Sequence, residues 1–185
     1  MAWRIPLLAI LALFVAVSCD RNLPTAAPDA LAGRDPGLLA TDGGVTAAHA
    51  VTGSGHYVTA AGGWRTFSFQ VRQKADGSVH GTFQLIAHVT PLKRWHGPLT
   101  CLSVVGNEAW VGGFYEKSTN PALLNTGFGF YVRDNGQGRN ADPDLVHRHA
   151  RGQEDPGDWC SSMPDVSGSE FLFPIESGNI TIHDR

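Results

Sequence analysis

Carboxylate and amide side chains gather around two glycines in residues 134–144. The oxygen-bearing residues are Asp134, Asn135, Asn140, Asp142 and Asp144. Calcium binds about six to eight oxygen atoms from a loop that glycine allows to curl, so this composition points to a calcium site. The order of residues does not follow the EF-hand pattern D-x-[DN]-x-[DN]-G, and no glutamate closes the loop. A polar hairpin loop, in which Asp and Asn bond their own backbone, is the alternative interpretation.

Histidines are the second set of residues that could bind a metal. His147 and His149 are two residues apart, so on a strand they would share one face and could bind zinc or copper. The prolines and charged residues around them indicate an exposed loop instead, and the spacing provides no third ligand. His80 and His88 lie on the same side of one predicted strand, about 26 Å apart, which is too far for one metal ion. The histidines therefore predict no metal centre.

Two other classes of chemistry lack their signatures. The chain has no G-x-S-x-G nucleophile elbow, and its glutamates are scattered rather than paired for glycoside hydrolysis. The formal net charge is −3, and Lys93-Arg94 is the densest basic pair. Since nucleic-acid binding needs a basic face, we exclude nucleic acid as a partner.

The start of the chain predicts export. Arg4 precedes an apolar run, Ile5–Val17, which is shorter than the roughly 20 residues that a membrane-spanning helix needs. Ala16-Val17-Ser18-Cys19 resembles the lipobox of bacterial lipoproteins, in which the cysteine is acylated and begins the mature protein. This resemblance implies that residues 1–18 are a signal peptide. It also implies that acyl chains on Cys19, such as palmitate, hold the protein on the bacterial cell membrane, facing outside the cytoplasm. A secretory signal with an incidental cysteine is the alternative.

Two cysteines remain besides Cys19. An even pair in an exported protein predicts a disulfide, so we expect Cys101 and Cys160 to be joined. The loop that they close holds about 60 residues, for which the chain-entropy treatment gives about 4 kcal/mol of stabilisation. Two separate buried thiols are the alternative, and the lack of a C-x-x-C motif speaks against zinc.

The candidate residues lie among segments in which apolar and polar side chains alternate with a period of two residues. In residues 64–73 the apolar members are Phe67, Phe69 and Val71. This alternation predicts a half-buried strand. Asp76-Gly77 then predicts a hairpin turn that leads into a second strand over residues 79–89.

The same rhythm continues along the chain. Further strands are predicted over residues 51–60, 99–105, 109–116, 126–133, 170–173 and 179–183. Lys93-Arg94-Trp95-His96 is expected at a loop tip, and residues 142–157 as a long loop with at most one short turn. About eight sequential strands close best as a single antiparallel β-barrel, because closure removes exposed edges. The predicted fold class is therefore all-β, with a two-sheet β-sandwich as the alternative.

The composition divides the chain into three parts. After the signal peptide, residues 19–48 are rich in Ala, Pro and Gly without any period, which predicts a lipidated flexible tether. Residues 49–185 then form the barrel domain.

Six short motifs stand out between residues 53 and 144. They are Gly53-Ser54-Gly55-His56, Arg65-Thr66-Phe67-Ser68-Phe69, Val79-His80-Gly81, Leu99-Thr100-Cys101-Leu102, Lys117-Ser118-Thr119-Asn120-Pro121 and Asp134-Asn135-Gly136-Gln137-Gly138. Together they resemble a family of exported bacterial proteins of unknown function, and the resemblance implies no activity. In outline the predicted barrel is also similar to the lipocalins and the allene oxide cyclases. That likeness is architectural and does not establish function.

A barrel of about eight strands either fills its interior with side chains or holds one small ligand. The inward residues are mainly Phe, Val and Leu, so one hypothesis is a binding protein for a small apolar ligand. A second is a rigid scaffold that presents loops to a protein partner. The competing class is a cyclase- or isomerase-type enzyme that acts through a shaped cavity. Its candidate catalytic residues are His56, Tyr57 and Arg65, because polar side chains are unusual in an apolar barrel.

Overall fold

Alternating residues produce antiparallel strands through most of the folded domain. The computed structural model describes residues 47–138 and 140–184. Its strands are β1 (Ala47–Val58), β2 (Trp64–Lys74), β3 (Val79–Ala87), β4 (Lys93–Val105), β5 (Glu108–Phe114), β6 (Lys117–Ser118), β7 (Gly127–Arg133), β8 (Leu145–His147), β9 (Ala150–Gln153), β10 (Leu172–Pro174) and β11 (Ser177–Asp184). A 3-10 helix, η1 (Pro121–Leu123), and a short α-helix, α1 (Pro156–Ser162), complete the secondary structure of these residues. Neither helix has the length or the apolar character needed to span a bilayer.

The β2–β3 hairpin shows how the local sequence dictates the ladder. Phe69 pairs with Phe83, so the buried residues of both strands share one face. The Asp76 carboxylate accepts hydrogen bonds from the backbone N–H and the hydroxyl of Ser78. Gly77 has φ of +82°, a left-handed conformation that glycine adopts without steric cost. The predicted hairpin is confirmed.

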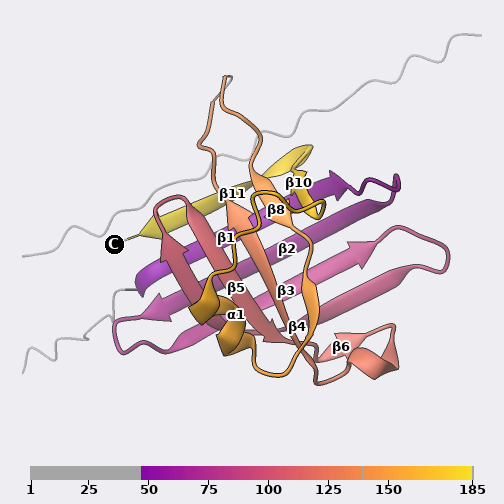
Figure 1. Cartoon of the computed structure of the whole chain (residues 1–185), viewed down its shortest axis with the longest axis horizontal. Coiled ribbons are helices and arrows are strands. Elements are labelled where there is room, and N and C mark those ends of the chain that lie inside the picture. The colour runs from indigo at the N-terminus through magenta and orange to yellow at the C-terminus, as the bar shows by residue number, and fades with distance from the viewer. Residues whose placement is uncertain (1–46, 139, 185) are drawn as a thin grey trace, which may run out of the picture. The chain divides into compact units, whose positions relative to one another are not determined.

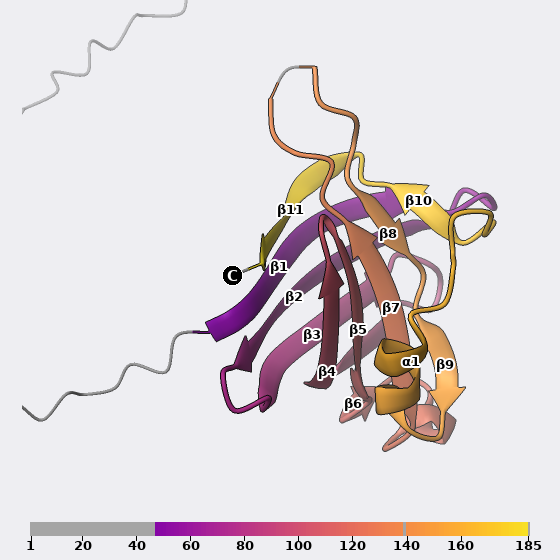
Figure 2. The ribbon, with the colours of Figure 1, turned by 60° about the vertical axis from the view of Figure 1, so that its left-hand side comes forward.

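The strands form one curled sheet in the order β10-β8-β7-β5-β4-β3-β2-β1-β11, while β6 pairs with β4 and β9 with β7. The sheet bends back on itself as a half-barrel (Figure 1 and Figure 2). The predicted all-β, antiparallel fold is confirmed, and the sandwich alternative is wrong because the ladder is one continuous sheet. Among the described strands, the end strands β10 and β11 do not pair with each other, so the curl ends in a seam.

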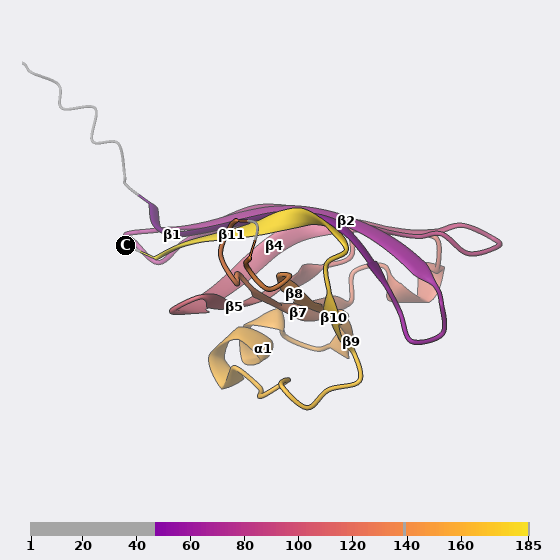
Figure 3. The same cartoon turned by 90° about the horizontal axis from the view of Figure 1, so that it is seen from above.

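Two cores lie on opposite faces of β4, β5 and β7. The inner core fills the curl with side chains such as Phe69, Phe83 and Phe130. The smaller outer core lies beneath α1 and includes Trp110 and Trp159. Figure 3 shows α1 on the side of β5 and β7 that faces away from β1 and β2.

Glycine in β7 lets α1 approach the sheet. A Cβ atom on Gly129 would lie 2.2 Å from Cγ of Trp159, so only glycine lets the indole rest on the strand. The neighbouring Phe128 and Phe130 point the other way, into the inner core. The Gly-Phe alternation of residues 127–130 thus serves both cores at once.

Two segments depart from the prediction. Residues 93–96, expected at a loop tip, begin β4, and Trp95 is buried opposite Leu85. Residues 142–157, expected as a loop, contain β8 and β9 and lead into α1. Strands of three or four residues are too short to display an alternation that can be recognised in the sequence.

The predicted signal peptide, Cys19 and nearly all of the tether lie outside the described residues. The first strand begins at Ala47, close to the domain boundary predicted at residue 49.

Candidate functional site

The inside of the half-barrel is filled by aromatic rings. Phe128 has its ring centroid 4.8 Å from that of Phe83 and 4.6 Å from that of Tyr115, and Phe69 lies 5.1 Å from Phe130. An internal cavity of about 10 Å³ remains, which is enough for about one water molecule. This cavity is smaller than a small apolar ligand, and the binding of such a ligand stays a prediction.

The three predicted catalytic residues do not converge. Tyr57 is buried, with its ring stacked on that of Phe173, and burial raises the pKa of its hydroxyl to about 12. Arg65 pairs with Tyr57 in the ladder, so the two lie on the same side of the sheet. His56 points to the opposite side, where its Nε2 lies 3.5 Å from a carboxylate oxygen of Glu176. The cavity beside Tyr57 is the water-sized one, so this group has no space for a substrate.

His147 is buried, whereas the sequence analysis expected an exposed loop. Its ring lies against those of Trp159 and Phe171, and its Nε2 is 3.1 Å from the Ser169 hydroxyl. The exposed-loop interpretation is therefore wrong for His147, which ends β8, whereas Arg148 is exposed and lies between β8 and β9. The spacing of two histidines does not indicate which residues from distant parts of the chain will pack against them and bury them.

His149 is also buried, but it has different neighbours. Its ring meets those of Phe83, Trp95 and Tyr115 edge to face. Burial, reinforced by the positive charge of Arg151, lowers the pKa of this imidazole to about 3. Arg151 donates a hydrogen bond from Nε to Nε2 of the ring at 2.8 Å, which assigns the ring proton of the neutral imidazole to Nδ1.

The rings of the two histidines contact different aromatic residues, although both histidines line the small internal cavity. Residues 47–138 and 140–184 contain no group of three or more His, Cys, Asp or Glu side chains placed to hold a metal ion. Around His149, the ring Nδ1, the Trp95 Nε1 and the Tyr115 hydroxyl are buried without a protein hydrogen-bond partner. Buried atoms of this kind commonly bind ordered water.

The segment considered for calcium forms the seam between the two ends of the sheet. The Asp144 carboxylate accepts hydrogen bonds from the backbone N–H groups of Asn135 (2.9 Å) and Ile180 (2.7 Å). The Asp134 carboxylate accepts one from the N–H of Ile182 at 3.1 Å. Ile180 and Ile182 belong to β11, whose one partner strand in the described sheet is β1. The two carboxylates therefore take the place of a neighbouring strand on the open edge.

This arrangement resembles the polar-loop interpretation, with one difference: the carboxylates also bond a distant strand. Asn140 and Asp142 are exposed and lie outside this network. Calcium binding stays a prediction, and Asp134 and Asp144 already have backbone partners.

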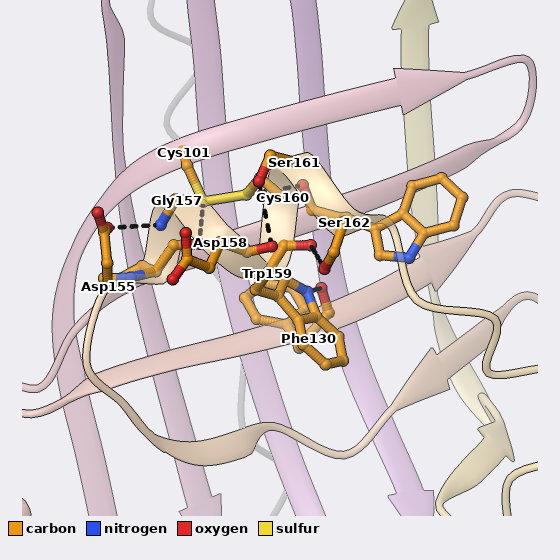
Figure 4. Close-up of a disulfide and its surroundings, with 11 residues drawn as sticks. Cys101, Phe130, Asp155, Gly157, Asp158, Trp159, Cys160, Ser161 and Ser162 are labelled. Atoms are coloured by element: carbon orange, nitrogen blue, oxygen red, sulfur yellow. Dashed lines mark hydrogen bonds between the residues drawn. A yellow bond between two sulfur atoms is a disulfide. The ribbon is translucent and has the colours of Figure 1, made fainter.

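Cys101 and Cys160 form the predicted disulfide, with their Cα atoms 6.1 Å apart. The bond ties β4 to α1 (Figure 4). The Asp155 carboxylate caps the start of the helix by accepting the N–H of Gly157. Trp159 donates from its indole Nε1 to the carbonyl oxygen of Phe130 at 3.1 Å. A helix of 7 residues is too short to be stable alone. The disulfide, the Asp155 cap and the Trp159 hydrogen bond therefore have a structural role, because they stabilise α1 on the sheet.

The outward side of β11, β1, β2, β3 and β4 carries hydroxyl and amide side chains in two rows. The first row is Thr181, Thr52, Gln70 and Thr82, and the second is Asn179, Ser54, Ser68, Gln84 and His96. We call these nine residues the polar face. It contains no Asp, Glu, Lys or Arg. Within the described chain, the hydrogen bond between Asn179 and Thr181 (2.9 Å) is the one side-chain bond that joins two of its members.

The polar face is hollowed rather than flat. A depression of about 520 Å³ is lined by all nine of its residues. A second depression of about 610 Å³ shares Gln70 and Thr82 with the first, and a third of about 440 Å³ shares Gln84 and His96. Because they share lining residues, the three depressions adjoin one another across the outside of the sheet. The two flanking depressions are also lined by the charged side chains of Arg72, Arg94 and Lys117.

An exposed tryptophan lies on the same side of β2 as the polar face. Trp64 is 49% exposed, and its ring stacks on that of His88 at 4.9 Å between centroids. The His56 ring meets it edge to face, and His88 is held by a hydrogen bond of 2.8 Å to the Thr66 hydroxyl. The sequence showed the alternation that exposes these residues, but it did not show that five strands would align them into a groove.

No protein-family model, curated protein or solved structure is significantly similar to this chain, so its proposed function rests on the surfaces described above.

Proposed function

We propose that this protein is a membrane-anchored binding domain that acts outside the cytoplasm and takes its ligand on the polar face. One observation carries the proposal: the inside of the curl leaves about 10 Å³, whereas the polar face carries a depression of about 520 Å³. A ligand larger than water therefore has more room in this depression than in the cavity beside Tyr57.

The anchor is the part of the proposal that comes from the sequence. Acyl chains on Cys19 hold the protein on the cell membrane, and residues 19–48 place the domain at a distance from the bilayer. Cys19→Ala removes the acylation site. We expect this variant to leave the membrane fraction, and unchanged membrane partitioning would refute the anchor.

The packing also ranks the alternatives. A small apolar ligand inside the barrel would have to displace packed rings such as Phe83 and Phe128. A cyclase-type enzyme would need His56, Tyr57 and Arg65 around one cavity, and His56 lies on the opposite side of the sheet. The role as a rigid scaffold is close to our proposal, with the sheet face replacing the loops as the presented surface.

The proposal is tested with delipidated cell walls, which remove any contribution of the acyl chains. The detergent-solubilised full chain should sediment with these walls. The double variant Gln70→Glu/Gln84→Glu, which adds two charges to the groove at nearly constant shape, should weaken binding by at least tenfold. Gln137→Glu, the same change at an exposed loop position outside the polar face, is the matched control. If the double variant binds like the wild type, the polar face is not the binding surface. Recovery of an apolar molecule by native mass spectrometry would favour the interior instead.

A further inference from the structure

We infer that the ligand of the polar face is an acidic polysaccharide, an inference that rests on the proposed function and specifies its ligand. The starting observation is the charge around the face. Arg72 lines the depression on one side of the central one, and Arg94 and Lys117 line the depression on the other side. Among the described residues that line the three depressions, none is Asp or Glu. A ligand that lies across them therefore meets positive charge at both ends and no acidic side chain between them.

Arg94 and Lys117 are placed to hold one anionic group together. His96 pairs with Gln84 on one side and with Lys117 on the other, so these three side chains share the outer face of the sheet. Arg94 precedes His96 by two residues on β4 and points the same way, which puts its Cα atom about 7–8 Å from that of Lys117. Both side chains are exposed and long enough to meet over that gap. Together they offer charged N–H donors to the oxygens of one carboxylate or phosphate.

The cations are available to a ligand. Within residues 47–138 and 140–184, Arg72, Arg94 and Lys117 form no ion pair with a carboxylate. The Glu116 carboxylate reaches the same end of the face, where it lies 3.6 Å from Nδ1 of His96, and it leaves the two cations in excess.

The strands around the polar face add to the positive potential. Residues 47–107, which include β1 to β4, contain one acidic residue, Asp76, and five basic ones: Arg65, Arg72, Lys74, Lys93 and Arg94. The formal net charge of the whole chain is −3, so positive charge is concentrated in these strands. A basic region of this kind attracts a polyanion before contact is made.

The side chains between the cations match the hydroxyl groups of sugars. Each Thr and Ser hydroxyl both donates and accepts a hydrogen bond, and each Gln amide provides two donors and an acceptor. The exposed members of the polar face are Thr52, Ser54, Ser68, Gln70, Thr82 and Gln84. A polysaccharide can bond these groups through its hydroxyls and the cations through its acidic groups. Weak single contacts then add up along the polymer.

The spacing of the cations distinguishes this ligand from nucleic acid and from a bilayer. Arg72 pairs with His80, and Arg94 pairs with Ile86 six residues further along β3, so the two cationic ends lie roughly 20 Å apart along the sheet. A nucleic acid strand carries a phosphate about every 3.4 Å, so most of its charges would lie over uncharged side chains. A bilayer binds through buried apolar side chains as well as charge, and the nine residues of the polar face provide none.

The test compares polysaccharides that differ in charge alone. The detergent-solubilised full chain is titrated by calorimetry with polygalacturonate and with the same polymer after full methyl esterification. Phosphorylated and unmodified starch make the same comparison for phosphate. We expect at least one charged polymer to bind about tenfold or more tighter than its neutral form, and added salt to weaken that binding. Equal binding of both pairs, or binding of neither charged polymer, would overturn the inference.

Variants locate the charge that the ligand needs. Arg94→Gln/Lys117→Gln removes the two neighbouring cations and should weaken binding by about tenfold or more, and Arg72→Gln should weaken it less. Lys93→Gln/Arg148→Gln removes the same charge from two exposed residues that line none of the three depressions. This matched control should bind within about twofold of the wild type, because salt screens distant charges. Circular dichroism and thermal melting of each variant ensure that lost binding is not lost folding.

The outcomes separate this inference from the proposed function. If Gln70→Glu/Gln84→Glu loses binding to cell walls while Arg94→Gln/Lys117→Gln binds them like the wild type, the inference is overturned and the proposed function stands. Wall binding that disappears after protease treatment, or tighter binding to single-stranded DNA or to vesicles of anionic lipid than to the charged polysaccharides, has the same consequence. If binding to walls ignores Gln70→Glu/Gln84→Glu, both proposals fall together. Competition of wall binding by the charged polymer, but not by its neutral form, supports both.

Discussion

The two faces of β2 and β3 lie in opposite environments. Along each strand, buried aromatic and aliphatic residues on the inner face alternate with exposed polar residues on the outer face. Phe69 and Phe83 pair across the ladder on the inside, where they pack into the aromatic core. One residue away, Gln70 and Thr82 pair on the outside, in the groove. The inner face provides the stability of the fold by burying rings. We expect the outer face, whose side chains are exposed, to contribute less to that stability.

We expect substitutions on the inner face to lower the free energy of unfolding more than substitutions on the outer face. Phe83→Ala removes a buried ring that contacts Phe128 and Phe130, so we expect the free energy of unfolding to fall by about 3–5 kcal/mol. Thr82→Ala, the adjacent residue on the outer face, should change it by about 1 kcal/mol or less, because it removes strand propensity and cross-strand contacts but no core packing. Urea unfolding of both variants measures the difference. Similar losses for the two would remove the distinction between the faces.

Low pH should also destabilise the fold through the inner face, because His149 is buried there as a neutral imidazole. The pKa of His149 is about 3 in the folded protein and 6.5 in its ordinary state. Between these values the unfolded chain binds a proton that the folded chain does not. The free energy of unfolding should therefore have its full value above pH 6.5. Below pH 6.5 it should fall by about 1.4 kcal/mol for each pH unit, down to about pH 3. Burial lowers the pKa of His147 in the same direction.

Urea unfolding at pH 7, 6, 5 and 4 tests this expectation. His149→Gln removes the ionisable ring, so its stability should depend less steeply on pH than that of the wild type. Carboxylates titrate in both proteins and cancel in the comparison. Equal slopes would show that His149 is not the buried neutral group described here.

We expect substitutions in the seam to lower the free energy of unfolding less than substitutions in the core but more than substitutions of exposed residues. Asp144→Asn keeps one acceptor oxygen and loses the other, which leaves a backbone N–H of Asn135 or Ile180 without its partner. We expect a loss of about 1–3 kcal/mol in the free energy of unfolding. Asp142→Asn, an exposed change in the same segment, is the control and should be nearly neutral.

Calcium provides the opposing outcome for this region. Because the Asp134 and Asp144 carboxylates already bond the backbone, we expect calcium to leave the melting temperature of the wild type unchanged. A rise in melting temperature that Asp142→Asn abolishes would show that this segment binds calcium and that Asp142 is one of the ligands.

The smallest effect on stability is expected on the polar face itself. The triple variant Ser54→Ala/Ser68→Ala/Gln84→Ala removes polar groups from three strands without touching the core. Its free energy of unfolding should change by less than about 1 kcal/mol, while binding to cell walls should decline. A large loss of stability would mean that the outer face also maintains the fold.

The sequence predicted the regular half of the domain well. Long alternating runs, such as residues 64–73 and 79–89, carry enough period-two signal to predict strand and face, and Asp76-Gly77 predicts their turn. The second strand, β3, ends two residues earlier than predicted, at Ala87. The pairing of Cys101 with Cys160 was predictable from the number of cysteines and from the predicted export of the chain. Short strands gave no such signal, so β8, β9 and the burial of Trp95 were missed.

By itself, then, the sequence determined which residues alternate, where the chain reverses and which cysteines pair, because these properties depend on neighbours a few residues apart or on chemistry alone. Tertiary structure decided the rest. It curled the sheet around rings from distant strands, buried His149 among Phe83, Trp95 and Tyr115, and bonded Asp144 to β11. It also aligned single polar residues from five strands into one groove. These features depend on the register and curvature of the whole sheet, which residues far apart in the chain establish jointly.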